Sequence, residues 1–197
     1  MIIKILKISL LFKYIMSHPG YLEIILGCMY AGKTSRLISI YKHNLIAEIP
    51  TVVINHIDDK RYDNEKMSTH DKIMISCIQT RKLYDIFEKN KELLDKTQAF
   101  IINEGQFFDD LYEVVRLLVR DHNKSVYVGG LDGDYKMQKF GQILDLIPLC
   151  DKVEKLHAIC SICKKPAAFT KRLTSETEQT VIGSDNYIPV CRLCHKL

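Results

Sequence analysis

The feature that most constrains the fold is a glycine-rich segment after an apolar run, with the residues Gly27, Cys28, Met29, Tyr30, Ala31, Gly32, Lys33 and Thr34. It matches G-x-x-x-x-G-K-[ST], a loop whose backbone N–H groups surround the phosphates of a nucleotide. The glycines allow a tight turn and a close approach to phosphate oxygens, while Lys33 supplies positive charge. The Thr34 hydroxyl can reach Mg²⁺. The sequence therefore predicts a site for ATP with Mg²⁺, with an ordinary glycine turn as the alternative.

The segments on either side of this loop have the character that the motif requires. Residues 21–26 form an apolar run typical of a buried strand, and residues 35–47 carry Leu37, Ile38 and Tyr41 at helical spacing. A helix that begins at the loop directs its free N–H groups toward the phosphates. Strand, loop and helix together favour a phosphate-binding loop over a simple turn.

Further strands and helices alternate along the chain. We expect strands at residues 51–56, 72–77, 100–102 and 125–130, a helix capped by Thr80 with an apolar stripe from Leu83 to Leu94, and a helix at about 109–121. Residues 58–71 are polar and predict a long surface loop. This order predicts an α/β fold of the P-loop NTPase type, a parallel sheet with helices on both faces and ligands at the carboxyl ends of its strands.

Length and composition fit one medium domain, or a domain with a small appendage. Of 197 residues, 47% are apolar and 26% charged, and the net charge of +4 is spread rather than clustered. We expect no nucleic-acid partner, no membrane segment and a cytoplasmic location. We assign residues 1–15 to an extension of unknown status, 16–151 to the α/β core and 152–197 to a second domain, which its cysteine pairs indicate to be zinc-binding.

The cysteines predict a metal site. Four of the seven form two C-x-x-C pairs near the C-terminus, Cys160 with Cys163 and Cys191 with Cys194. Beside a nucleotide loop, such pairs indicate a metal rather than disulfides. Four thiolates complete the tetrahedral coordination of Zn²⁺ and leave no open position, so we expect the zinc to be structural.

The chain between the two pairs is longer than the about 15–20 residues of common zinc ribbons. It must therefore project as an extended loop or hairpin, with β-like pieces at residues 167–172 and 179–182. Two other interpretations are open for the cysteines. One is covalent haem at C-x-x-C-H, which would use His195 and leave Cys160 and Cys163 unexplained; the other is a redox pair.

A second candidate for catalysis lies at the end of the expected strand 100–102, where Asn103 and Glu104 follow it. In a phosphate-loop fold, an acid at a strand end holds a magnesium-bound water, and a neighbouring carboxylate can accept a proton from the nucleophile. Asn103 is neutral, so Glu104 is the candidate general base. A glutamate at a strand end can also be an ordinary surface acid.

In this order, the loop, the strand-end glutamate and the cysteine pairs resemble the type II thymidine kinases, a family of cytosolic and viral enzymes. The resemblance runs from about residue 21 to the C-terminus. It includes the segments 27–34, 59–62, 69–71, 104–108, 131–133, 140–141, 170–173, 181–183 and 190–194. It implies transfer of the γ-phosphoryl group of ATP to the 5′-hydroxyl of thymidine, with dTMP and ADP as products, and it implies a homotetramer inhibited by dTTP.

The resemblance also implies roles for individual residues. Glu104 would be the general base, and the ATP site would comprise residues 27–34 with Asp59, Arg61, Asn103 and Gln106. The zinc hairpin would form a lasso over the nucleoside. The nucleoside site would comprise Met29, Phe107, Leu131, Tyr135, Phe140, Thr170, Gln179, Thr180, Val181, Ile182, Gly183 and Tyr187.

This sequence departs from the family pattern at several positions. Asn103 stands where the family usually has Asp, which puts the handling of Mg²⁺ in question, and Tyr135 stands where Phe is common. Cys28 replaces the usual Pro, and the segment after Gly183 is one residue shorter than expected. Two functions are alternatives to a thymidine kinase. One is a phosphate-loop ATPase whose zinc ribbon binds nucleic acid, and the other is a nucleotide sensor without catalytic activity.

Overall fold

The computed structural model describes residues 19–57, 66–68, 74–181 and 183–196. The expected extension at residues 1–15 lies outside the described residues. So do three residues of the expected site, Asp59, Arg61 and Ile182. None of the described helices is long and apolar enough to cross a bilayer.

The centre of the molecule is a parallel sheet, as predicted. Its strands are β1 (Tyr21–Gly27), β2 (Thr51–His56), β5 (Ile78–Thr80), β6 (Ala99–Ile102), β7 (Ser125–Gly130) and β8 (Lys152–Leu156). They pair in the order β5-β2-β6-β7-β1-β8, and every pairing is parallel. The carboxyl ends of all six strands therefore meet at one edge of the sheet, where ligands bind in folds of this kind.

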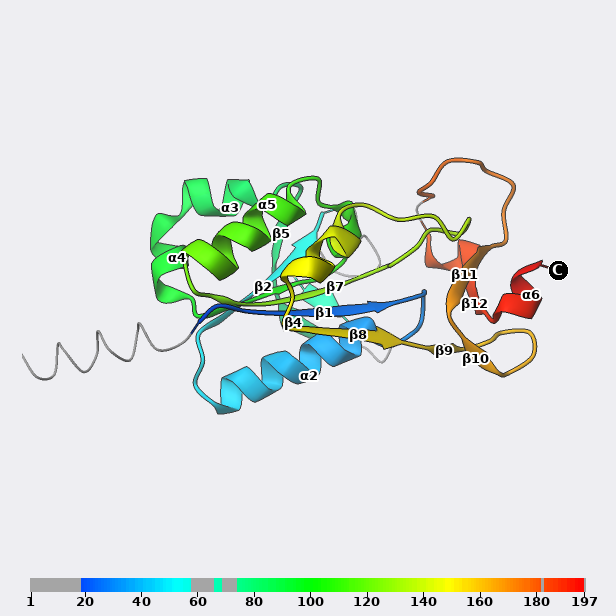
Figure 1. Ribbon diagram of the computed structural model, residues 1–197, viewed down its shortest axis with the longest axis horizontal. Helices are drawn as coiled ribbons and strands as arrows, with labels where there is room; N and C mark the ends of the chain where they lie inside the picture. The colour runs from blue at the N-terminus through cyan, green and yellow to red at the C-terminus, as the bar shows by residue number, and fades with distance from the viewer. Residues whose placement is uncertain (1–18, 58–65, 69–73, 182, 197) are drawn as a thin grey trace, which may run out of the picture.

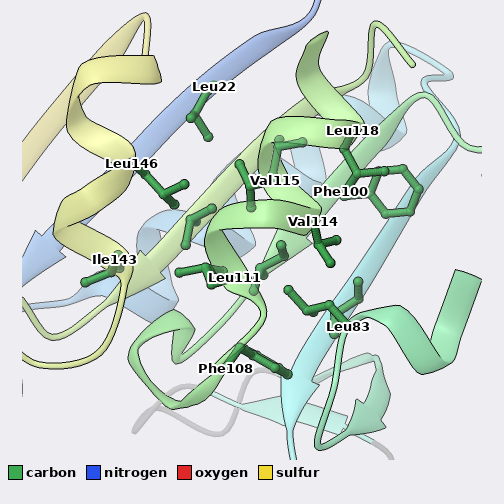
Figure 2. Packing of buried hydrophobic residues seen from close by; sticks show 14 of the residues in the cluster. Leu22, Leu83, Phe100, Phe108, Leu111, Val114, Val115, Leu118, Ile143 and Leu146 are labelled. Carbon is green, nitrogen blue, oxygen red and sulfur yellow. The ribbon is translucent and has the colours of Figure 1, made fainter. Parts of the chain in front are cut away.

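Helices cover both faces of the sheet, which confirms the predicted layers. The helix α2 (Lys33–Ile46) lies on one face, and α3 (Tyr84–Lys89), α4 (Lys91–Lys96), α5 (Leu111–Arg116) and η3 (Ile143–Leu149) lie on the other (Figure 1). Side chains alternate along β1, so Leu22 and Ile24 join the core beneath α5 while Ile25 packs with Leu37 of α2. Figure 2 shows the larger of these two cores.

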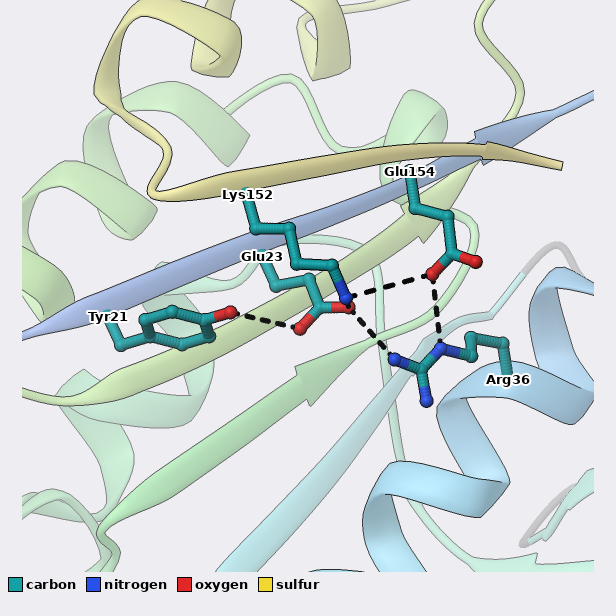
Figure 3. Close-up of polar contacts among 5 residues, drawn as sticks. All are labelled: Tyr21, Glu23, Arg36, Lys152 and Glu154. Atoms are coloured by element: carbon teal, nitrogen blue, oxygen red, sulfur yellow. Dashed lines mark hydrogen bonds and ion pairs between the residues drawn. The ribbon is translucent and has the colours of Figure 1, made fainter.

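A buried carboxylate fixes α2 to the sheet. Glu23 of β1 accepts hydrogen bonds from the Tyr21 hydroxyl at 3.1 Å, from Arg36 of α2 at 3.3 Å and from Lys152 of β8 at 2.9 Å (Figure 3). Arg36 also donates to Glu154 of β8 at 3.2 Å. Because α2 begins at the glycine-rich loop, these bonds help to set the position of the loop.

The expected helix after Thr80 is wrong in two respects. It is divided at Asn90 into α3 and α4, because the Asn90 side chain accepts a hydrogen bond from Leu93 N at 3.0 Å and so caps a new helix. Thr80 caps neither helix: it is the last residue of β5, and its hydroxyl donates to Lys82 O at 2.9 Å. The expected helix at 109–121 begins later, as α5, and continues as the π-helix η2 (Leu117–Asp121).

The expected strand at residues 72–77 is also corrected. Its described part, β4 (Met74–Ser76), pairs antiparallel with β3 (Lys66–Ser68) in a separate ribbon. The sheet strand is the following segment, β5, which pairs with β2. Short apolar runs that follow each other closely do not reveal from sequence which one enters the sheet.

The C-terminal part is a set of short antiparallel pairs at the carboxyl edge of the sheet (Figure 1). These are β9 (Ala158–Ile159) with β10 (Pro166–Ala167) and β11 (Phe169–Arg172) with β12 (Tyr187–Val190), followed by α6 (Arg192–Lys196). The expected strand at residues 179–182 is wrong for the described residues 179–181, because Gln179 O accepts from the Arg172 side chain and the backbone of Val181 bonds to the Tyr187 hydroxyl instead of entering a ladder. Since β8 pairs with β1, we propose that the boundary between the two parts follows Leu156 rather than residue 151.

Candidate active site

The glycine-rich loop connects β1 to α2 at the carboxyl edge of the sheet. Gly27 has a φ of 151° and Gly32 a φ of 88°, and Tyr30 between them is left-handed at 62°. A Cβ on Gly27 would lie 2.7 Å from Leu156 O, so this turn requires glycine. Gly32 precedes α2 and has no side chain to cap it, and the N-terminus of a helix is a favourable position for an anion. Lys33 Nζ donates to Cys28 O at 2.8 Å, across the loop.

The loop is attached to the C-terminal part by two side chains. Met29 N donates to Thr170 Oγ1 of β11 at 3.0 Å, and the Cys28 thiol donates to Ala167 O at 3.5 Å. Cys28 is buried in an apolar cluster that includes Cys160 and Cys194. Burial raises the pKa of the Cys28 thiol, so it stays protonated and serves as a packing residue. The phosphate loop and the cysteine region thus form one packed unit.

Glu104 follows β6 at the same edge and is 4% exposed. Its backbone is left-handed, with a φ of 52°, a conformation that is costly for a residue with a side chain and is often found at functional sites. Gln106 Nε2 donates to Glu104 Oε2 at 2.6 Å, while Gln106 Oε1 accepts from Leu131 N at 2.9 Å. Gln106 therefore fixes the orientation of the carboxylate and connects it to the segment after β7.

Two glycines allow the backbone to pack around Gln106. A Cβ on Gly130 would lie 2.4 Å from Gln106 Oε1, and one on Gly141 would lie 2.1 Å from Gln106 O. Gly141 also has a φ of 59°, which favours glycine. Gln106, which we expected to bind ATP, is thus tightly enclosed and holds the Glu104 carboxylate in place.

Two polar residues at the end of β2 were missed by the sequence analysis. Asn55 Oδ1 accepts a hydrogen bond from Asn103 Nδ2 at 3.0 Å, so the two amides meet at the ends of neighbouring strands. The His56 ring packs on Phe107 at 5.6 Å and edge-on to Phe108 at 4.8 Å between ring centroids. Their position after a strand was a usable signal, because the carboxyl ends of parallel strands gather ligand-binding groups.

The segment after β7 brings several of the expected nucleoside-site residues together. Leu131 and Phe140 are each 8% exposed, and the Phe140 ring packs edge-on to Phe107 with centroids 5.5 Å apart. Asp134 organises this segment, since its Oδ1 accepts from Lys136 N at 2.8 Å and Gln138 N at 2.9 Å. An apolar wall backed by fixed polar groups is typical of a small-molecule site.

We call residues 173–186, which connect β11 to β12, the lasso. Its described part lies against the segment after β7: the Tyr135 hydroxyl donates to Thr177 O at 3.0 Å, and Gln179 Nε2 donates to Asp134 Oδ2 at 2.9 Å. The Tyr187 hydroxyl accepts from Val181 N at 3.1 Å and donates to Val181 O at 3.2 Å. Thr180 is exposed, and Gly183 is left-handed with a φ of 128°.

The four expected metal ligands converge. The sulfur atoms of Cys160, Cys163, Cys191 and Cys194 all lie within 4.8 Å of one another, and those of Cys163 and Cys191 are 3.6 Å apart. Tetrahedral zinc with Zn–S bonds of about 2.3 Å places its sulfurs about 3.8 Å apart, so this donor set fits the metal. Burial raises the pKa of Cys160, but backbone N–H groups of Cys163, Cys191 and Ile162 outweigh it and lower the pKa to about 6. The surroundings therefore favour a thiolate at Cys160, whereas burial and the neighbouring cysteines raise the pKa of Cys194 to about 12, so zinc would have to displace the Cys194 proton.

The fold and this edge of the sheet define the class: a phosphate-loop α/β protein with a four-cysteine module beside the loop. Comparison with known proteins identifies the family within this class. A family model described as thymidine kinase matches residues 20–195. A thymidine kinase of Oryza sativa subsp. japonica is 41% identical over 179 residues, which cover 89% of this chain and 66% of that protein.

Viral relatives match over nearly their whole length. A thymidine kinase of Sheeppox virus (strain KS-1) is 39% identical over 181 residues, covering 90% of this chain and 98% of the relative. A thymidine kinase of Myxoma virus (strain Uriarra) is 38% identical, with coverage of 90% and 97%. The chain belongs to the thymidine kinase family, which confirms the resemblance seen in the sequence. Nothing in these matches supports an ATPase stimulated by nucleic acid or a sensor.

Proposed function

We propose that this protein transfers the γ-phosphoryl group of ATP to the 5′-hydroxyl of thymidine, giving dTMP and ADP. The observation that carries the proposal is the buried Glu104, which a glutamine orients at the same sheet edge as the phosphate loop, in a member of the thymidine kinase family. Phosphoryl transfer depends on positioning and electrostatics, together with a base for the attacking hydroxyl. The phosphate loop would supply the positioning and the charge, and Glu104 would supply the base.

The loop and Glu104 divide the chemistry. Residues 27–34 bind the triphosphate through backbone N–H groups and the start of α2, and Lys33 exchanges its bond to Cys28 O for the β/γ-phosphates. Glu104 accepts the proton of the 5′-hydroxyl as that oxygen attacks phosphorus. Mg²⁺ that arrives with ATP would be held by Thr34 and a water bound to Asn103, and it would neutralise phosphate charge.

The nucleoside would bind between the segment after β7 and the lasso. Leu131, Phe107 and Phe140 would give the site its apolar wall, with Met29, Tyr135 and Thr170 at its border. Backbone groups of the lasso, from Gln179, Thr180, Val181, Ile182 and Gly183, would bind the base, with Tyr187 behind them. Zinc held by the four cysteines would be structural, because a complete ligand set leaves no position for a reacting molecule.

Other properties follow the family. We propose that Asp59 and Arg61 assist near the phosphates, that dTTP inhibits the enzyme by feedback, and that the protein is a cytoplasmic homotetramer. Light scattering coupled to size-exclusion chromatography measures the assembly, and addition of dTTP to the assay measures the inhibition. A monomer, or a rate unaffected by dTTP, would contradict the corresponding proposal.

A coupled assay for ADP release tests the main proposal, with thymidine and deoxycytidine as separate acceptors. We expect turnover that depends on thymidine and exceeds turnover with deoxycytidine. Product analysis should show dTMP in equal amount to ADP, because ADP without dTMP would mean hydrolysis. A zinc-loaded protein that releases no thymidine-dependent ADP would overturn the proposal.

A further inference from the structure

The side chain of Arg172, the last residue of β11, holds the lasso by a concentrated set of hydrogen bonds. Arg172 is 7% exposed. Its Nη1 donates to the carbonyls of Glu176 at 2.9 Å and Glu178 at 2.6 Å, and its Nη2 donates to the carbonyl of Gln179 at 3.0 Å. Nη2 also donates to the Tyr187 hydroxyl at 2.7 Å. Three carbonyls within four residues of the lasso thus turn toward one guanidinium.

Two aromatic rings enclose the same guanidinium. Its central carbon lies 3.8 Å from the ring centroid of Tyr135 and 5.1 Å from that of Tyr187, both within cation–π range. The hydroxyls of both rings also form hydrogen bonds with the lasso: Tyr135 donates to Thr177 O and Tyr187 donates to Val181 O. Tyr135 belongs to the segment after β7, so Arg172 connects the lasso to the core as well as to the hairpin.

The charge of Arg172 explains why the lasso stays close to its side chain. Among the residues described, no carboxylate lies within ion-pair distance of its guanidinium, so carbonyl dipoles and aromatic faces compensate the buried charge. A buried cation without these partners is costly. Because the carbonyls come from the lasso, a lasso that moves away leaves the cation unpaired, and the cation therefore favours one lasso position.

We propose that Arg172 is a positioning residue that sets the affinity for the nucleoside by holding the lasso against the segment that carries Tyr135. The inference rests on the proposed function, because it assumes that the lasso binds thymidine. Arg172 itself touches no reacting atom in this scheme: its two Nη groups donate to the lasso and to Tyr187, and its Nε is buried without a hydrogen-bond partner among the described residues. Its role is to keep the backbone groups of residues 179–181 preorganised for the base.

Steady-state kinetics of zinc-loaded variants test the proposal. Arg172→Met keeps the length but removes every donor, and we expect the KM for thymidine to rise about 10- to 100-fold. The KM for ATP should stay within about twofold, because the hydrogen bonds and ring contacts of Arg172 go to the lasso, Tyr187 and Tyr135 rather than to the phosphate loop. Arg172→Lys keeps the charge but lacks the planar guanidinium, so its KM for thymidine should lie between those of Arg172→Met and wild type. Arg120→Met, at an exposed arginine of η2, is the matched control and should change neither KM.

Limited proteolysis with a glutamate-specific protease gives a readout that needs no activity. Cleavage after Glu176 and Glu178 should be faster in Arg172→Met than in wild type or Arg120→Met, at equal zinc content. Thymidine should slow cleavage of wild type and protect Arg172→Met far less.

The two assays separate the possible failures. Equal cleavage of Arg172→Met and wild type would overturn the holding role. Faster cleavage with an unchanged KM for thymidine and unchanged protection would overturn the link to nucleoside affinity. If wild type lacks thymidine-dependent turnover, the proposed function fails, and thymidine protection alone then decides: protection lost in Arg172→Met supports the positioning role, and protection unchanged overturns it.

Discussion

At the scale of single residues, Glu104 carries the most specific prediction. Glu104→Gln keeps the shape of the side chain but removes its ability to accept a proton, so kcat should fall about 10²- to 10⁴-fold. The KM for ATP should change little, because the phosphate loop is untouched. The measurement is the coupled ADP assay with saturating thymidine. A variant that keeps most of its kcat would remove Glu104 from the role of base.

Asn103 carries a prediction about Mg²⁺. An aspartate here could hold a metal-bound water with a full negative charge, so Asn103→Asp should lower the Mg²⁺ concentration that gives half-maximal rate. Asn103 Nδ2 now donates to Asn55 Oδ1, so the Asn55 amide would have to turn to donate to the new carboxylate. A Mg²⁺ titration of the rate at fixed ATP measures the effect. An unchanged midpoint would show that Asn103 takes no part in holding the metal.

Single residues show clearly what the sequence could and could not reveal. The positions of Lys33 and of the cysteine pairs were predictable because each belongs to a spacing that a particular chemistry requires, and the position of Glu104 was predictable because it follows a buried strand. Arg172 was not, because its partners are mainly backbone carbonyls, which every residue has and no sequence pattern distinguishes. Gln106 was placed at the nucleotide because its support of Glu104 depends on how closely Gly130 and Gly141 approach it.

At the scale of elements, the bond between the phosphate loop and β11 can be tested by Thr170→Val. Valine has nearly the same shape but leaves Met29 N without its acceptor. We expect the KM for ATP to rise about fivefold, which corresponds to about 1 kcal/mol. Thr170→Ser keeps the hydroxyl and is the matched control. If only the KM for thymidine changes, Thr170 serves the nucleoside and not the loop.

The attachment of α2 to the sheet depends on Glu23, which bonds to Arg36 and Lys152 (Figure 3). Glu23→Gln should lower the free energy of unfolding by about 1–2 kcal/mol, because it removes charge from a buried acceptor whose two cations remain partly hydrated. Urea unfolding measures it. Glu154→Gln changes a more exposed partner of Arg36 and should cost less than about 0.5 kcal/mol. Equal losses would show that burial of Glu23 is unimportant.

Elements were predictable where one pattern dominated. The apolar runs of β1, β6 and β7 and the stripe of α2 stand out because these elements are buried. The edge strand β8 was missed because its sequence, KVEKL, is rich in charges, and the structure shows Lys152 and Glu154 in the ionic network beside α2. The division of one expected helix at Asn90 depends on a single side-chain cap that competes with helix continuation.

At the scale of the whole molecule, the cysteine module and the phosphate loop share one apolar cluster. Cys28 of the loop packs there with Cys160, Cys194 and Val190, whereas the two clusters of the sheet contain no residue beyond Leu156. The sheet can therefore keep its core when the module loosens. The phosphate loop packs on the module through Cys28, so loosening of the module should also disturb the loop.

This arrangement predicts the result of removing zinc. Four thiolates without a metal would repel or become protonated, and the hairpin would lose the constraint that aligns β11 with β12. Both the KM for thymidine and the KM for ATP should rise, since Thr170 and Ala167 bond to the phosphate loop and Thr170 lies in β11, the strand that leads into the lasso. Far-UV circular dichroism should keep most of its helical signal, because the described helices other than α6 and the short η4 (Ser184–Asn186) belong to the part that contains the sheet.

Cys160→Ser and treatment with a chelator are two routes to the same state, and zinc content measured by colorimetric release verifies each. Readdition of zinc to the chelated wild type should restore both KM values, while Cys160→Ser should recover little, because a hydroxyl is a poor ligand where the site requires a thiolate. Arg172→Met is the contrasting variant, with zinc retained and only the KM for thymidine raised. If zinc removal raised the KM for thymidine and left that for ATP unchanged, the contacts of Cys28 and Met29 would not couple the module to the phosphate loop.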